Sequence, residues 1–150
     1  MSYGQYVEAT NQLHRSAFEQ IDWAIELLTH QDYEGRATGA ALLEAAARTN
    51  PTEPRLVATI NELESLAVRP MAEDGKEFEA NCAAIMALHQ IKTDEAIEAL
   101  KRIVTCPLWD EMGGDDCQWE AASALSERVG QPFMVSDNPV QAAINWVTKN

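Results

Sequence analysis

Apolar residues recur at steps of three and four positions along almost the whole chain, which is the spacing of an amphipathic α-helix. Near the start these positions are Phe18, Ile21, Ala24, Ile25 and Leu28. The residues just before them, Ser-Ala-Phe-Glu at 16–19, match a helix capping box. No segment shows the sustained alternation of apolar and polar residues that a half-buried strand requires. The sequence therefore predicts an all-α protein.

Helix-breaking and capping residues divide this pattern into separate helices. The segment Asn50–Pro54 interrupts it, Pro107 stops it again, and Gly130 ends a later helix. Thr93 and Asn138 have side chains suited to capping the helices that follow them. We expect helices over residues 16–30, 33–48, 54–68, 77–91, 94–105 and 117–129, and a last helix that begins at 138–139.

The helix expected over residues 33–48 is rich in small side chains. They are Ala37, Gly39, Ala40, Ala41, Ala45 and Ala46. Gly39 lowers the helix propensity by up to about 1 kcal/mol relative to alanine. We expect a close approach by a neighbouring helix at this position, because such an approach would offset that loss.

Three alanine-rich segments of the chain resemble one another, and each ends in leucine. They are Arg-Ala-Thr-Gly-Ala-Ala-Leu-Leu at 36–43, Asn-Cys-Ala-Ala-Ile-Met-Ala-Leu at 81–88 and Gln-Trp-Glu-Ala-Ala-Ser-Ala-Leu at 118–125. If Leu43, Leu88 and Leu125 are equivalent, the periods between them are 45 and 37 residues. Each segment follows a more conventional amphipathic helix, at 22–30, 54–68 and 95–105 respectively.

This pattern resembles HEAT-like repeats, which are helical hairpins of roughly 40 residues. The resemblance implies a short α–α solenoid of about three hairpins with flanking helices, forming one domain over residues 1–150. HEAT-like repeats often carry an arginine early in the inner helix. Here Arg36 occupies that position once, whereas Asn81 and Gln118 occupy the two matching positions. A helical bundle without repeats, built from alanine-rich helices, is the alternative.

The chain is strongly acidic, with a formal net charge of -13 that is spread along its whole length. Such a charge repels nucleic-acid backbones and anionic lipid, and it attracts cationic partners. Neither a secretion signal nor an apolar run of roughly 18 residues, as a membrane span needs, is recognisable. The cysteines are Cys82, Cys106 and Cys117, and no two of them form a CxxC motif, so we expect free thiols in a cytoplasmic protein. From the charge and the missing apolar run, we expect contact with neither nucleic acid nor membrane.

Motifs for catalysis or cofactor binding are not recognisable in the sequence. The histidines His14, His30 and His89 belong to no HExxH motif and to no zinc-type cluster. There is no nucleophile elbow and no phosphate-binding loop. We therefore expect no catalytic residue, no cofactor and no metal, and an enzyme is the less favoured reading.

The most unusual local feature is an acidic segment that contains two tryptophans. Its residues are Trp109, Asp110, Glu111, Asp115, Asp116, Trp119 and Glu120. Tryptophan is enriched at binding hot spots and acids steer a basic partner, so this segment is the expected partner-binding site. In the alternative reading, Asp115 and Asp116 cap a helix and the tryptophans pack inward. Calcium is a further alternative, although the spacing differs from that of an EF-hand.

A second acidic stretch occurs at the equivalent hairpin connection one repeat earlier. It comprises Glu73, Asp74, Glu77 and Glu79. If the hairpins stack, both acidic stretches fall on one edge of the molecule.

These features favour a non-catalytic binding module whose acidic surface holds a basic protein. An immunity-type or antitoxin-type inhibitor is a specific version, by analogy of size and charge. The alternative is an enzyme accessory or lyase-type HEAT-like protein that binds a chromophore or small ligand in a concave groove. Self-association through an apolar end of the stack is a third possibility.

Overall fold

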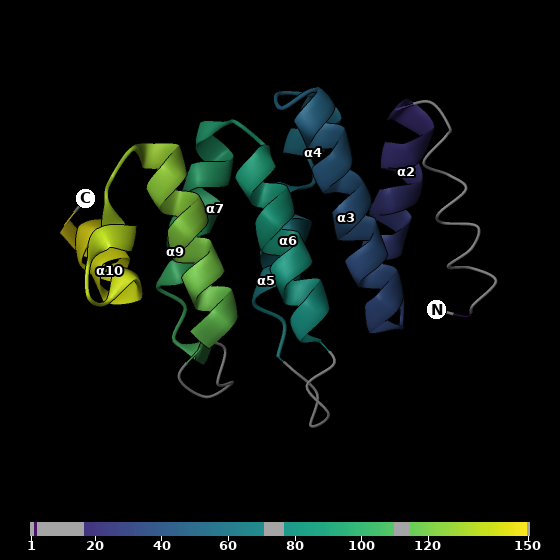
Figure 1. Ribbon diagram of the computed structural model, residues 1–150. Helices are drawn as coiled ribbons and strands as arrows, with labels where there is room; N and C mark the ends of the chain where they lie inside the picture. Colours follow the sequence, from purple (N-terminus) through teal and green to yellow (C-terminus); the bar gives the residue numbers. More distant parts are fainter. Residues whose placement is uncertain (1, 3–16, 71–76, 110–114, 150) are drawn as a thin grey trace.

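The computed structural model describes residues 2, 17–70, 77–109 and 115–149, and all regular secondary structure in these ranges is helical (Figure 1). The prediction of an all-α protein is therefore confirmed for the described chain. The helices are α2 (Ala17–Leu28), α3 (Tyr33–Thr49), α4 (Pro54–Val57), α5 (Ile60–Ala67), α6 (Phe78–Gln90), α7 (Asp94–Val104), α9 (Asp115–Val129) and α10 (Pro139–Lys149), with a 3₁₀ turn η1 (Phe133–Val135) before the last.

Three helix boundaries lie at residues that were predicted from the sequence, two through side-chain caps and one through a glycine. Thr93 Oγ1 accepts a hydrogen bond from Ala96 N at 3.3 Å, and Asn138 Oδ1 accepts one from Gln141 N at 3.1 Å. Gly130 ends α9 with φ of 69°, a left-handed conformation that glycine adopts without strain. The capping box expected at 16–19 includes Ser16, which lies outside the described residues.

Helical structure begins and ends close to the expected bounds of 54–68, but it is divided into α4 and α5, so the prediction of one continuous helix was wrong. The regular helix is interrupted at Ala58 and Thr59, although both keep right-handed helical dihedral angles, and the amide of Thr59 bonds to the carbonyl of Leu56 three residues earlier. The buried hydroxyl of Thr59 donates to the carbonyl of Leu56 at 2.7 Å. A threonine side chain that takes a nearby backbone carbonyl competes with the helical ladder, which gives a local reason for the break.

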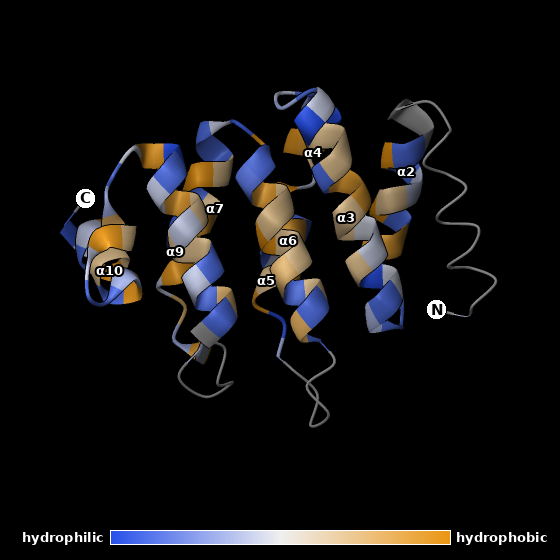
Figure 2. Ribbon diagram, in the orientation of Figure 1, coloured by the Kyte–Doolittle hydropathy of each residue, from blue (hydrophilic) through white to orange (hydrophobic). Residues whose placement is uncertain are grey.

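The helices form two layers (Figure 1). α3, α6 and α9 lie side by side, and each packs against the helix that precedes it in the chain, namely α2, α5 and α7. α3 and α6 pack together extensively, whereas α2 and α5 touch only slightly. The core lies between the layers, and Leu43, Leu88 and Leu125 are completely buried within it. Figure 2 shows the hydropathy along α6, where hydrophilic residues lie toward both ends and apolar residues lie between them.

The close approach expected at Gly39 is present between α2 and α3. A Cβ atom at this position would lie 2.7 Å from the carbonyl oxygen of Ala24 and 2.9 Å from Cβ of Leu27. No side chain fits in that space without movement of the neighbouring backbone. The glycine is therefore required by packing.

Arg36, Asn81 and Gln118, which occupy matching positions in the three similar segments, share one structural role. Each side chain donates hydrogen bonds of 2.6 to 3.1 Å to backbone carbonyls at or just beyond the end of the preceding helix. The acceptors are the carbonyls of His30 and Gln31, of Leu66 and Arg69, and of Val104. Terminal carbonyls have no partner within their own helix, and these side chains supply one.

Arg36 also forms a buried ion pair with Glu77. Its Nε and Nη2 atoms donate to the two carboxylate oxygens at 3.0 and 2.6 Å, and the side chains are only 5% and 6% exposed. Arg69 approaches the same carboxylate at 3.4 Å. The expectation that Glu77 belongs to an outward-facing acidic stretch is therefore wrong, because this carboxylate fixes α3 against the start of α6. Its neighbours Glu73 and Asp74 lie outside the described residues.

The C-terminal helix α10 is held less deeply than the others. Ala143 is its only fully buried residue within the described part. Trp146 is partly buried, with its ring centroid 5.8 Å from that of Phe133 and 5.3 Å from Nζ of Lys101. α10 therefore docks through a few aromatic and aliphatic contacts on η1, α7 and α9.

Candidate functional site

Trp109 does not lie on the surface. Its side chain is 1% exposed, and its Nε1 atom donates to the carbonyl oxygen of Ile103 at 2.5 Å. The expectation that Trp109 contacts a partner is therefore wrong. The apolar ring is packed inside the fold, and its single polar atom already has a hydrogen-bond partner.

The remaining residues of the expected site are only partly described, and those that are described differ in exposure. Asp110 and Glu111 lie outside the described residues, and Asp115 begins α9 without a described side chain. Glu120 is half-buried, so it does not extend freely toward solvent. Only Asp116 and Trp119 are exposed and described, and they are the part of the expected site that the structure brings together.

Asp116 and Trp119 line a groove between the first turns of α9 and the start of α10. The groove has a volume of about 430 Å³. Its other lining residues are Gln118, Asp137, Asn138, Pro139 and Val140. Trp119 is 45% exposed, which is unusual for so large an apolar side chain. We call this feature the Trp119 groove.

The walls of the Trp119 groove are formed by the first turns of α9 and by the start of α10. Gln118 donates to the carbonyl of Val104 at 2.9 Å, which fixes the first turns of α9 to the end of α7. On the other wall, Asn138 caps α10 and Pro139 occupies its first position, where its fixed φ suits the helix. The groove is thus built on regular backbone on both sides.

The charge of the Trp119 groove is negative. Asp116 and Asp137 are both exposed, and within the described residues neither forms a salt bridge. The positive ends of two helices partly offset these carboxylates. An exposed indole beside unpaired carboxylates suits an arginine or lysine side chain, which can stack on the ring and pair with the acids.

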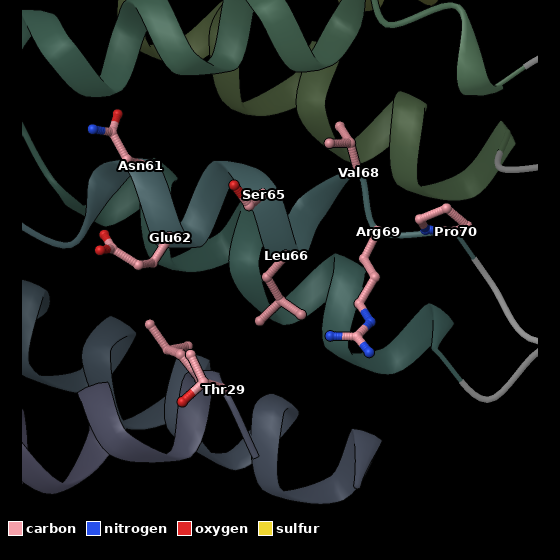
Figure 3. Close-up of a pocket in the computed structure, with 9 residues that line it drawn as sticks. Thr29, Asn61, Glu62, Ser65, Leu66, Val68, Arg69 and Pro70 are labelled. Atoms are coloured by element: carbon pink, nitrogen blue, oxygen red, sulfur yellow. The ribbon is translucent and has the colours of Figure 1, made fainter. Parts of the chain in front are cut away.

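A second hollow of about 600 Å³ lies where α2 and α5 separate (Figure 3). Its lining residues are Leu28, Thr29, Asn61, Glu62, Ser65, Leu66, Val68, Arg69 and Pro70. Figure 3 shows Leu66 of α5 pointing toward Thr29 across the gap, whereas Asn61 and Ser65 point away from it. Among the described residues that line it, the one cationic group is the guanidinium of Arg69, which already pairs with Glu77. Its size suits a small ligand, but it offers few converging polar groups.

Comparison of the chain with protein-family models, curated proteins and solved structures finds no match. Among the described helices, none combines the length and the apolar character that crossing a membrane demands.

The second wall of the Trp119 groove was not predicted from the sequence. Asn138 and Pro139 were expected only as the start of a helix, and Asp137 was given no role. Nothing in the local pattern indicates that residues 137–140 lie beside Trp119, which is 18 positions earlier than Asp137. The only available signal is the exposed acid next to a cap, and that signal is common at helix starts.

Proposed function

We propose that this chain is a non-catalytic binding module that holds a basic protein segment in the Trp119 groove. The observation that carries the proposal is an exposed tryptophan that lines a groove together with Asp116 and Asp137, two exposed carboxylates that form no salt bridge with any described residue. An overall charge of -13 adds a long-range attraction for a cationic partner.

The same proposal includes a short solenoid of HEAT-like hairpins as the scaffold. Three features support it: the alternation of two helix layers, the matching buried leucines, and the shared role of Arg36, Asn81 and Gln118. In such a scaffold the tightly packed layer of α3, α6 and α9 forms the inner side. The looser layer of α2, α5 and α7 forms the outer side.

An immunity-type or antitoxin-type inhibitor is a specific form of this proposal. It is supported by the size of the chain, by its acidity and by the absence of a recognisable catalytic motif from the sequence. In this form, a basic toxin would place an arginine or lysine in the Trp119 groove and lose access to its own substrate.

Binding of labelled peptides tests the proposal. We expect arginine-rich and lysine-rich peptides to bind, and an uncharged peptide of equal length not to bind, by fluorescence anisotropy. Affinity should fall steeply as the ionic strength rises from about 0.05 M to about 0.5 M, because the contacts are exposed and screened. Equal binding of the basic and the uncharged peptides would contradict the proposed function.

Variants locate the binding site. Trp119→Ala should weaken binding by about 30-fold, which corresponds to about 2 kcal/mol for a hot-spot tryptophan. Asp137→Asn should weaken it and reduce the salt dependence. Glu26→Gln is the matched control, because Glu26 is an exposed acid on α2 and its loss changes the net charge equally. Equal losses in Asp137→Asn and Glu26→Gln would mean that only the overall charge matters.

The hollow between α2 and α5 carries the second candidate function, which is binding of a chromophore or other small ligand. Its volume of about 600 Å³ falls in the range of small-molecule sites. Native mass spectrometry of the protein purified from its own source would detect a bound molecule. Ser65→Trp would fill the hollow from an exposed position and should abolish such binding, whereas it should leave peptide binding unchanged.

A further inference from the structure

Two of the three cysteines face one another across the contact between α6 and α9. The sulfur atoms of Cys82 and Cys117 are 2.8 Å apart, although 35 residues separate them in the chain. Both are free thiols in the structure. The distance exceeds the ~2.05 Å length of a disulfide bond by less than about 1 Å. The two sulfurs therefore need to approach by less than about 1 Å to reach bonding distance.

We propose that Cys82 and Cys117 form a redox-sensitive pair whose oxidation to a disulfide links α6 to α9. The inference does not depend on the proposed binding function, because it rests on the geometry of the two sulfurs alone. Free thiols were expected from the sequence, but their juxtaposition was not, since nothing in the spacing shows that α6 and α9 are neighbours.

The environments of the two sulfurs assign different roles to them. Cys82 is half-buried and accessible, whereas Cys117 is completely buried. The two sulfurs share a hydrogen bond in which either can be the donor, and Cys117 Sγ also lies 3.9 Å from the carbonyl oxygen of Phe78. The hydrogen bond from Cys117 lowers the pKa of Cys82, an effect that burial and the nearby carboxylates of Glu120 and Asp116 oppose.

The pKa of Cys117 is raised, first by that same hydrogen bond and then by burial. Cys82 is therefore the residue that reaches the thiolate form and attacks an oxidant, and Cys117 is the residue that resolves the product.

The reaction is balanced with hydrogen peroxide as the oxidant. The Cys82 thiolate attacks one peroxide oxygen, the O–O bond breaks, and hydroxide leaves and takes up a proton to become water. The resulting sulfenic acid then reacts with the Cys117 sulfur. The S–S bond forms, the S–O bond breaks, and the oxygen leaves as a second water with the Cys117 proton. Two thiols are oxidised and one peroxide is reduced.

Cys106 provides an internal control. It is half-buried beyond the end of α7, and its backbone N–H bonds to the carbonyl of Ile103. Among the described hydrogen bonds, none joins Cys106 to either sulfur of the pair, so it should keep its thiol when the pair is oxidised.

The test treats the folded protein with hydrogen peroxide, alkylates the remaining thiols in denaturant, and maps the peptides by mass spectrometry. Wild type should lose two of its three thiols and yield one linked peptide that joins Cys82 to Cys117 within a single chain. Dithiothreitol should restore all three thiols. Cys106→Ser should give the same link and retain no free thiol.

Two further variants complete the test. Cys82→Ser and Cys117→Ser should give no intramolecular link, and circular dichroism should show that both keep their helical content. Cys117→Ser should instead accumulate sulfenic or sulfinic acid at Cys82. Three intact thiols in oxidised wild type, a link that involves Cys106, or links only between chains would each overturn the inference.

Discussion

Gly39→Ala tests the close contact between α2 and α3, and two opposing effects decide its sign. Alanine is the better helix former, which alone would stabilise α3 by about 1 kcal/mol. Against this, the new Cβ would meet the carbonyl oxygen of Ala24 at 2.7 Å, Cβ of Leu27 at 2.9 Å and the amide nitrogen of Leu28 at 3.1 Å. Two of these three atoms belong to the backbone, which cannot rotate away.

The magnitude of the Gly39→Ala effect follows from that geometry. Overpacking of a well-packed contact costs about 1–3 kcal/mol, and the upper part of this range applies because α2 must shift as a whole. After the gain in helix propensity, we expect a net loss of about 2 kcal/mol in the free energy of unfolding. For a chain of this length, that loss corresponds to a fall in Tm of about 4–8 °C.

Urea unfolding followed by far-ultraviolet circular dichroism measures the Gly39→Ala effect. Ala41→Gly is the control, because Ala41 is exposed on the same helix and its loss removes helix propensity without touching α2. It should destabilise by about 1 kcal/mol. If Gly39→Ala were as stable as wild type or more so, α2 and α3 would not approach as closely as the structure shows.

Three further predictions concern the buried ion pair, the tryptophans and the disulfide. Glu77→Gln leaves the buried guanidinium of its partner without a countercharge, and we expect a loss of about 3–5 kcal/mol in urea unfolding. Trp109→Ala should destabilise by about 3–5 kcal/mol because the side chain is buried, whereas Trp119→Ala should change stability by less than about 1 kcal/mol. Oxidation of Cys82 and Cys117 closes a loop of 35 residues and should raise the free energy of unfolding by about 4 kcal/mol in the chain-entropy estimate.

Each of these predictions has a control and a contrary result. Glu79→Gln removes an exposed acid near Glu77 and should have little effect, so equal losses would show that the ion pair is not buried. Equal stability losses in the two tryptophan variants would contradict their assigned exposures. For the disulfide, peroxide should not raise the stability of Cys117→Ser, and a gain similar to that of wild type would assign the effect elsewhere.

The sequence was sufficient wherever a feature depends on a few adjacent residues. The helical pattern, the caps at Thr93 and Asn138 and the turn at Gly130 all involve neighbours within four or five positions. The close approach at Gly39 could also be predicted, because an isolated glycine in an alanine-rich helix indicates that a neighbouring helix leaves no room for a side chain. The break at Thr59 was missed because a threonine hydroxyl bonds to its own helix in some contexts and not in others.

The candidate site was less accessible to sequence reasoning because it depends on contacts between distant segments. Trp109 is buried in the folded protein, where its indole nitrogen donates to the carbonyl of Ile103 in α7. Glu77 pairs with Arg36, which lies 41 residues earlier in the chain. The Trp119 groove exists only because α10 docks beside α9. Composition identified the acidic and aromatic residues, but it could not show which of them share a surface.

The shallow docking of α10 has a consequence for how the Trp119 groove persists in solution. A segment with one fully buried residue detaches in sub-global openings that need far less free energy than complete denaturation. Amide hydrogens of α10 should then exchange faster than those of α3 or α6. Because α10 supplies one wall, the groove disappears in every such opening while the rest of the chain stays folded. A ligand that occupies it would slow exchange at the C-terminus selectively.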